Sequence, residues 1–224
     1  MKIPRLSEGV SLRIFKLSAR QFVAGVLLWV ALAATGRAEE GAAAASLSPG
    51  DSIVFYGGGM VERLLEEGFL EAQLQLALPG RQLKVRSLAW TGDEVGHRLR
   101  PEGYVEHMKS LLTAWPAKVV VLGYGMSESF AGLGGVENFR AQYEIHLREM
   151  ARRHAGATLV LLSPIAAGEH PGTNTVGRNR ELAAYTDVVA DLARKHRARF
   201  IDLFAASREA YARSPEPLDR KSVV

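Results

Sequence analysis

The strongest constraint on the fold of this chain is an alternation between short apolar segments and stretches with helical periodicity. Five segments have the length and composition of β-strands: residues 53–56, 83–86, 119–122, 159–162 and 200–203. Between them, apolar residues recur every three or four positions, as on the buried face of a helix. The first such stretch predicts a helix from Val61 to Leu76 that stops at Pro79. Strands that alternate with helices are typical of βαβ units and a mainly parallel sheet.

The composition of the individual strands predicts their order. The first, third and fourth segments are apolar throughout, as buried central strands are, whereas the second alternates apolar and polar residues as an edge strand does. This favours a flavodoxin-like order of 2-1-3-4-5. We therefore predict an α/β fold, a three-layer α/β/α sandwich around a parallel sheet of about five strands. Ligands of such sheets lie beyond the carboxyl ends of the strands. Four loops follow these ends: residues 57–60, 89–97, 123–135 and 163–177.

The first 38 residues have the pattern of a secretory signal peptide, with predicted cleavage after Ala38. Basic residues precede an apolar run of 13 residues, which is short of the roughly 20 that a membrane span requires. An uncleaved anchor is the alternative. We therefore expect a periplasmic or secreted protein, with a linker over residues 39–48 and one domain over residues 49–224.

Removal of the leader changes the charge balance. It takes away six basic residues and one acidic residue, which leaves 22 basic and 23 acidic residues and a formal net charge of −1. We therefore see no basic footprint for nucleic acid. The absence of cysteine excludes disulfides, thiolate metal sites and a cysteine nucleophile.

Three of the loops carry motifs in a recognisable order. Residues 51–60 form a strand that ends in three glycines, residues 87–95 contain Trp-Thr-Gly-Asp, and residues 119–128 end in Gly-Met-Ser-Glu. In order and spacing these segments resemble the first three sequence blocks of the SGNH (GDSL-type) hydrolases. Within that superfamily they look closest to exported bacterial esterase-like domains. The resemblance extends from about Gly50 to Leu203 and implies an ester hydrolase acting on small-molecule or saccharide esters, without cofactor or metal ion.

The catalytic positions of the family are occupied by other residues here. Gly59 stands where the family has its serine nucleophile, and Gly58 stands where it has aspartate. Gly92 corresponds to the oxyanion glycine, and Asp93 follows it as in the family. Ser127 stands where the family has its oxyanion asparagine.

The fourth catalytic element of the family is an Asp-x-x-His block near the C-terminus. Asp219 has no histidine three residues later, so we expect the domain to lack this block through truncation or alteration. In a serine hydrolase, loss of the serine or the histidine alone lowers the rate roughly 10⁶-fold. The resemblance therefore implies an ester hydrolase that is weak or inactive.

Three functional hypotheses follow. In the first, a residual esterase uses Ser127 as nucleophile with His97 or His170, since residues 125–129 approach a G-x-S-x-G nucleophile elbow. In the second, a non-catalytic module binds an acylated sugar or similar ligand at the same loops. In the third, the chain is a fragment that is nonfunctional or needs a partner.

Other polar and aromatic residues near the strand ends have more than one interpretation. The glycine triplet lacks the lysine and the spacing of a phosphate-binding loop, which favours a tight turn. Aromatic residues beside carboxylates suit a sugar, although core packing explains them equally well. The residues concerned are the acids Asp93, Glu94, Glu128 and Glu169, which a hard cation could also use, and the aromatics Tyr56, Trp90 and Tyr124. The remaining histidines fall on predicted helices, where surface or packing roles are expected: His107, His146, His154 and His196.

Overall fold

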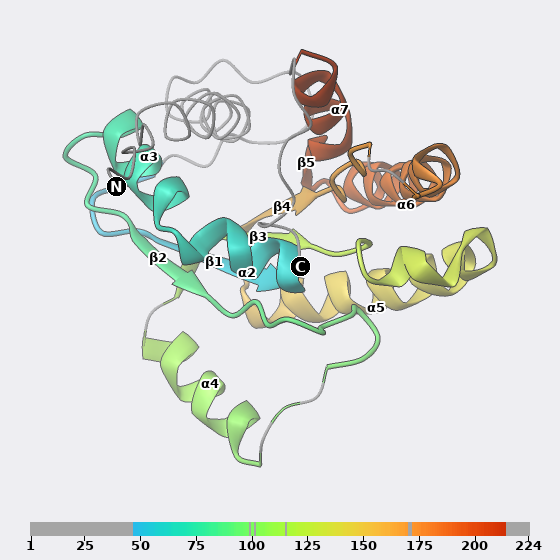
Figure 1. The fold of residues 1–224 in the computed structure, drawn as a ribbon. Coiled ribbons are helices and arrows are strands. Elements are labelled where there is room, and N and C mark those ends of the chain that lie inside the picture. Colours follow the sequence, from blue (N-terminus) through green and yellow to red (C-terminus); the bar gives the residue numbers. More distant parts are fainter. Residues whose placement is uncertain (1–46, 99, 101, 115, 170–171, 214–224) are drawn as a thin grey trace, which may run out of the picture.

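The computed structural model describes residues 47–98, 100, 102–114, 116–169 and 172–213. A five-stranded parallel sheet forms its centre, in the order β2-β1-β3-β4-β5 (Figure 1). The predicted strand order is therefore confirmed. The strands are β1 (Ser52–Gly57), β2 (Lys84–Ser87), β3 (Ala117–Gly123), β4 (Thr158–Leu162) and β5 (Arg199–Ile201).

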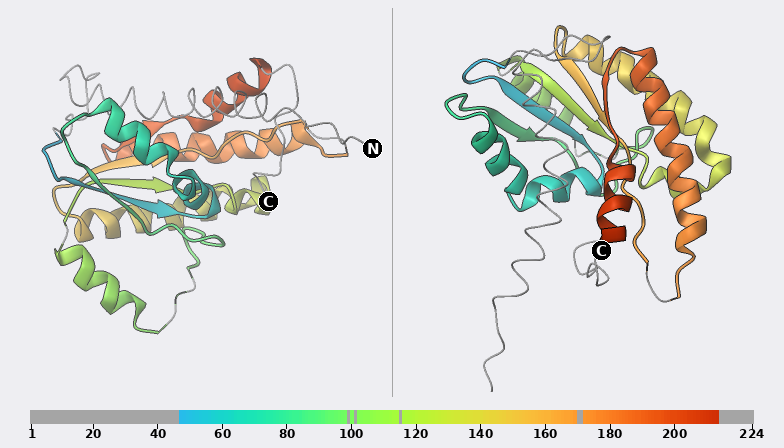
Figure 2. Two further views of the ribbon diagram at one scale, coloured as in Figure 1. Left: turned by 60° about the vertical axis from the view of Figure 1, so that its left-hand side comes forward. Right: turned by 90° about the horizontal axis from the view of Figure 1, so that it is seen from above.

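Helices cover both faces of this sheet, which gives the predicted three layers (Figure 2). The described helices are α2 (Gly59–Glu66), α3 (Phe69–Ala77), α4 (Tyr104–Ala114), α5 (Val136–Arg153), α6 (Thr175–Lys195) and α7 (Leu203–Arg213). Side chains of α2, α3 and α7 pack on one face, and those of α5 and α6 pack on the other. The apolar runs of the central strands follow from burial on both faces. Within the described residues, no helix has the length and apolar character of a membrane span.

The region between β1 and β2 differs from the sequence prediction. One helix was expected from Val61 to Leu76, but two short helices meet at Gly68, whose φ of 68° lies in the left-handed region. Glycine adopts this conformation at no steric cost, so the chain changes direction there. As a result Leu76, expected on a buried face, is 73% exposed.

The segment after β3 was expected to be loop and instead forms two short 3-10 turns. These turns are η1 (Glu128–Ala131) and η2 (Leu133–Gly135), and they lead directly into α5. The ends of β1 and β3 lie side by side because Gly57 pairs with Gly123 in the last step of the register. The loops after these two strands therefore start from adjacent points at the carboxyl edge of the sheet.

Candidate active site

The glycine triplet forms the junction between β1 and α2. Gly57 ends the strand, Gly58 is the N-cap of the helix and Gly59 is its first residue. A Cβ atom added to Gly58 would lie 2.7 Å from the carbonyl oxygen of Asp93 and 3.8 Å from Oγ of Ser127. The structure thus brings together the glycine triplet, the loop after β2 and the loop after β3.

The second of these loops turns sharply beside the triplet. The N–H of Trp90 donates to the carbonyl of Gly57 (3.0 Å), and the N–H of Asp93 donates to the carbonyl of Trp90 (2.9 Å). Gly92 occupies the turn with a φ of 88°, a conformation that favours glycine. Backbone geometry alone therefore accounts for a glycine at this position.

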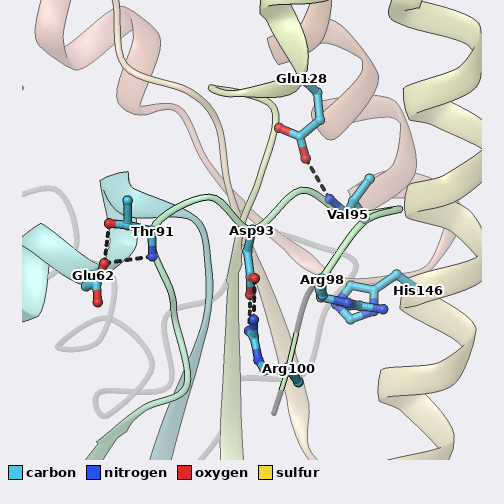
Figure 3. A network of polar contacts seen from close by, with 8 residues as sticks. All are labelled: Glu62, Thr91, Asp93, Val95, Arg98, Arg100, Glu128 and His146. Carbon is cyan, nitrogen blue, oxygen red and sulfur yellow. Dashed lines mark hydrogen bonds and ion pairs between the residues drawn. The ribbon is translucent and has the colours of Figure 1, made fainter.

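Asp93 is 3% exposed, and its carboxylate pairs with Arg100 through both guanidinium nitrogens (Figure 3). The guanidinium carbon lies 5.1 Å from the ring centroids of both Trp90 and Tyr104. The hydrogen bonds that Arg100 donates to Asp93 raise the pKa of the Arg100 guanidinium above its ordinary value. This carboxylate therefore anchors the loop.

Glu128 ties two of the loops to each other. Its two carboxylate oxygens accept hydrogen bonds from the N–H of Val95 (2.8 Å) and from the N–H of Gly125 (2.7 Å). Burial raises the pKa of the Glu128 carboxyl, while these backbone N–H groups act in the opposite direction. Figure 3 shows the carboxylate reaching down to the backbone beside Val95. We call this contact the Glu128 bridge.

A contact that the sequence did not reveal joins α2 to the turn after β2. Glu62 Oε2 accepts hydrogen bonds from the N–H of Thr91 (2.7 Å) and from the Thr91 hydroxyl (Figure 3). The hydroxyl oxygen lies 3.1 Å from the point where a Cβ atom at Gly59 would sit. The two partners are 29 residues apart in the chain, and no local pattern signals their pairing.

Ser127 lies half-buried at the start of η1, and its hydroxyl has no hydrogen-bond partner in the described part of the chain. The loop around it is held from α6. Arg178 donates to the carbonyl of Met126 (3.1 Å) and to the hydroxyl of Ser129 (2.7 Å). The same guanidinium stacks 4.1 Å from the ring centroid of the exposed Phe130.

No histidine among the described residues forms a hydrogen bond with the hydroxyl of Ser127 or of Thr91. His97 is exposed, and its backbone pairs with that of Glu94. His170, the other candidate base, lies outside the described residues.

Two histidines of the α5 region are buried and have packing roles. Arg98 donates to Nδ1 of His146 at 2.7 Å, and Tyr56 Oη lies 2.9 Å from Nε2 of His154. Figure 3 labels Arg98 and His146 beside α5. Burial lowers the pKa of both imidazoles, to about 4 for His154.

The acidic and aromatic residues near the strand ends were candidates for a metal or sugar site. Within the described ranges there is no group of three or more side chains that could hold a metal ion. The Tyr56 and Tyr124 rings are buried, and burial raises the pKa of each phenol to about 12. Of these three aromatic residues, Trp90 is the exposed one, at 49%.

Comparison with known proteins identifies the family. A model of the GDSL-like lipase/acylhydrolase family matches residues 50–222. The chain belongs to this family. The resemblance inferred from the three sequence blocks is thereby confirmed, and the fold of this GDSL-like protein agrees with it.

Solved structures of esterases are similar to this GDSL-like protein. One is the acetyl xylan esterase AlAXEase, with 16% identity and a TM-score of 0.54, covering 72% of this chain and 80% of that chain. Another is a catalytic mutant of Axe2, an acetylxylan esterase from Geobacillus stearothermophilus, with 15% identity and a TM-score of 0.55, covering 75% and 82%. At such identities the likeness shows the fold alone. Among curated proteins, none matches the chain.

Proposed function

We propose that this GDSL-like protein binds an acylated small molecule or saccharide at the carboxyl edge of its sheet and hydrolyses it poorly or not at all. The observation that carries this proposal is Gly59, which starts α2 where the family has its nucleophile and brings no hydroxyl of its own. The triad chemistry of the family requires a hydroxyl or thiol, a base that takes its proton, and a group that orients the base.

The surroundings of this position support a retained binding site. Gly58 and Gly59 place no side chain between α2 and the neighbouring loops, and the Glu128 bridge holds these loops together. The names of the similar structures, which are acetyl xylan esterases, suggest acetylated saccharides as the first ligands to test.

The test combines turnover and binding with the full chain. We expect hydrolysis of p-nitrophenyl acetate to remain within about 10³–10⁴-fold of the uncatalysed rate, together with calorimetric binding of acetylated xylo-oligosaccharides. Gly59→Ala places a methyl group 3.1 Å from the Thr91 hydroxyl and should weaken binding. Gly134→Ala is the matched control, because a Cβ there meets no atom within 4 Å. A kcat/KM of about 10⁴ M⁻¹s⁻¹ or more, typical of an efficient enzyme, would refute the proposal.

A second candidate function is a residual esterase with Ser127 as nucleophile. It is favoured by the half-buried hydroxyl of Ser127, which faces the Cβ position of Gly58 at 3.8 Å and is not bound to another described group. Ser127→Ala would abolish turnover under this alternative. It would leave turnover unchanged if Ser127 only replaces the oxyanion asparagine of the family without donating to the substrate.

We also propose that the protein is exported, on the basis of the signal-peptide pattern of residues 1–38, which lie outside the described residues. N-terminal sequencing of the protein recovered from its host should begin at Glu39. A chain recovered with Met1 in place, whether free in the cytoplasm or anchored, would contradict cleavage.

A further inference from the structure

A hydroxyl group lies close to the position that the missing nucleophile would occupy. Thr91 Oγ1 is 3.1 Å from the Cβ that a side chain at residue 59 would have, so it borders the space of a serine hydroxyl at that point. Thr91 is exposed, and it belongs to the turn that also carries Gly92. Reactants could therefore reach its oxygen.

This hydroxyl donates to a carboxylate that is able to accept its proton. Glu62 Oε2 accepts hydrogen bonds from both the hydroxyl and the N–H of Thr91, so the hydroxyl is held against a carboxylate oxygen. The second oxygen of Glu62 has no partner in the described part of the chain. Glu62 is fixed in the first turn of α2, three positions after Gly59. A hydroxyl bonded to a positioned base is the arrangement that nucleophilic catalysis requires.

We propose that Thr91 is a surrogate nucleophile of this site and that Glu62 is its base, so that small acyl esters acylate Thr91 slowly. This inference rests on the proposed function, because it concerns the same ligand class at the same site. The Thr91 mechanism differs from the Ser127 alternative because a base is bound to the attacking hydroxyl. Ser127 has none among the described residues, whereas Thr91 has Glu62.

Glu62 carries the proton in both steps of the proposed acyl transfer. Thr91 Oγ1 attacks the carbonyl carbon of the ester while its proton passes to Glu62. The bond from that carbon to the alcohol oxygen then breaks, and the alcohol leaves with the proton from Glu62. Water then attacks the acyl carbon and gives one proton to Glu62. The bond from that carbon to Thr91 Oγ1 breaks, the carboxylic acid leaves, and Oγ1 takes the proton back from Glu62. We assign the N–H of Gly92, the next residue in the chain, to the oxygen that becomes negative in the intermediate.

The rate expected from this pair is low. A carboxylate is in general a weaker base than the imidazole of a serine hydrolase. We therefore expect the acyl-threonine to form over minutes to hours and to persist, because the same weak base must activate the water that removes it. A persistent adduct can be detected directly.

The experiment is acetylation of the full chain by p-nitrophenyl acetate, followed by peptide mass spectrometry. We expect an acetyl group on Thr91 that hydroxylamine removes, as it removes esters and not amides. Thr91→Val should abolish this label, and Thr91→Ser should retain it. Glu62→Gln should slow labelling on the order of 10²-fold, the usual effect of losing a general base.

Matched controls separate the chemistry from a change in folding. Thr158→Val removes a threonine hydroxyl at the start of β4, away from the carboxyl edge of the sheet, and Glu71→Gln removes the corresponding first-turn acid of α3. Both should label like the wild type. A label on Ser127, no label at all, or equal rates for the wild type and Glu62→Gln would overturn the inference.

The outcome also distinguishes this inference from the proposed function. A wild-type chain that binds acetylated xylo-oligosaccharide but takes no acetyl group on Thr91 overturns the role of Thr91 and leaves the binding function standing. A chain that takes the label on Thr91 but binds no saccharide supports the inference and contradicts saccharide as the ligand.

Discussion

Removal of the Glu128 bridge should weaken the fold by separating two loops of the site. Its carboxylate accepts one hydrogen bond on each oxygen, from Val95 at 2.8 Å and from Gly125 at 2.7 Å. A hydrogen bond to a charged group contributes about 1.5–3 kcal/mol. In Glu128→Gln one oxygen remains and an NH₂ group faces the other N–H, so we expect a loss of about 2 kcal/mol in the free energy of unfolding. Glu128→Ala leaves both N–H groups without this acceptor and should cost about 3–5 kcal/mol.

Urea unfolding of the full chain measures these differences. For a protein of this length, about 2 kcal/mol corresponds to a fall of roughly 4–8 °C in Tm. Glu137→Gln is the control, since this first-turn acid of α5 is exposed and should change stability by less than about 0.5 kcal/mol. Hydrogen exchange at the amides of Val95 and Gly125 should accelerate in Glu128→Gln. If that variant matches the control in both stability and exchange, the bridge has no structural role and the reasoning is refuted.

Three further predictions concern the frame of the site. Gly57→Ala should cost at least about 1–3 kcal/mol, because its Cβ would lie 2.4 Å from the carbonyl oxygen of Gly123; urea unfolding equal to wild type would contradict this. Burial holds the His154 pKa near 4, below its unfolded value of 6.5. Stability should therefore be complete above pH 6.5 and fall by up to about 3 kcal/mol as the pH drops towards 4. Unfolding measured against pH should show a smaller fall in His154→Gln. Asp93→Asn leaves Arg100 without its buried charge partner and should cost about 3–5 kcal/mol in thermal unfolding, whereas a loss below about 1 kcal/mol would show that solvent takes over the pairing.

The sequence was sufficient to predict the sheet because each strand is buried to a different degree. The runs at residues 53–56, 119–122 and 159–162 are apolar on both faces, and only central strands tolerate this. The break at Gly68 was missed because the apolar spacing continues across it. The spacing of apolar residues carries no signal for a single glycine that changes the direction of the chain.

The site was predicted as a set of neighbouring loops, but the use of its side chains was not. Asp93 and Glu128 do lie at the carboxyl edge, yet both carboxylates are taken up by local partners. Those partners are a guanidinium seven residues away and backbone N–H groups, and neither leaves a motif. The pairing of Glu62 with Thr91 depends on how α2 packs against a distant turn, which only the folded chain determines.

The packing of Val61 has a consequence for any attempt to place a serine at residue 59. Its methyl group fills the space above Gly57 and Gly123, so a Cβ on either glycine would come within 2.5 Å of it. The helix that begins at Gly59 thus packs directly on the two strands, with no free space between Val61 and these glycines. A serine introduced at residue 59 would therefore need its space on the side of Thr91, whose hydroxyl lies 3.1 Å from the new Cβ. Such a variant requires Thr91 to move away from Glu62.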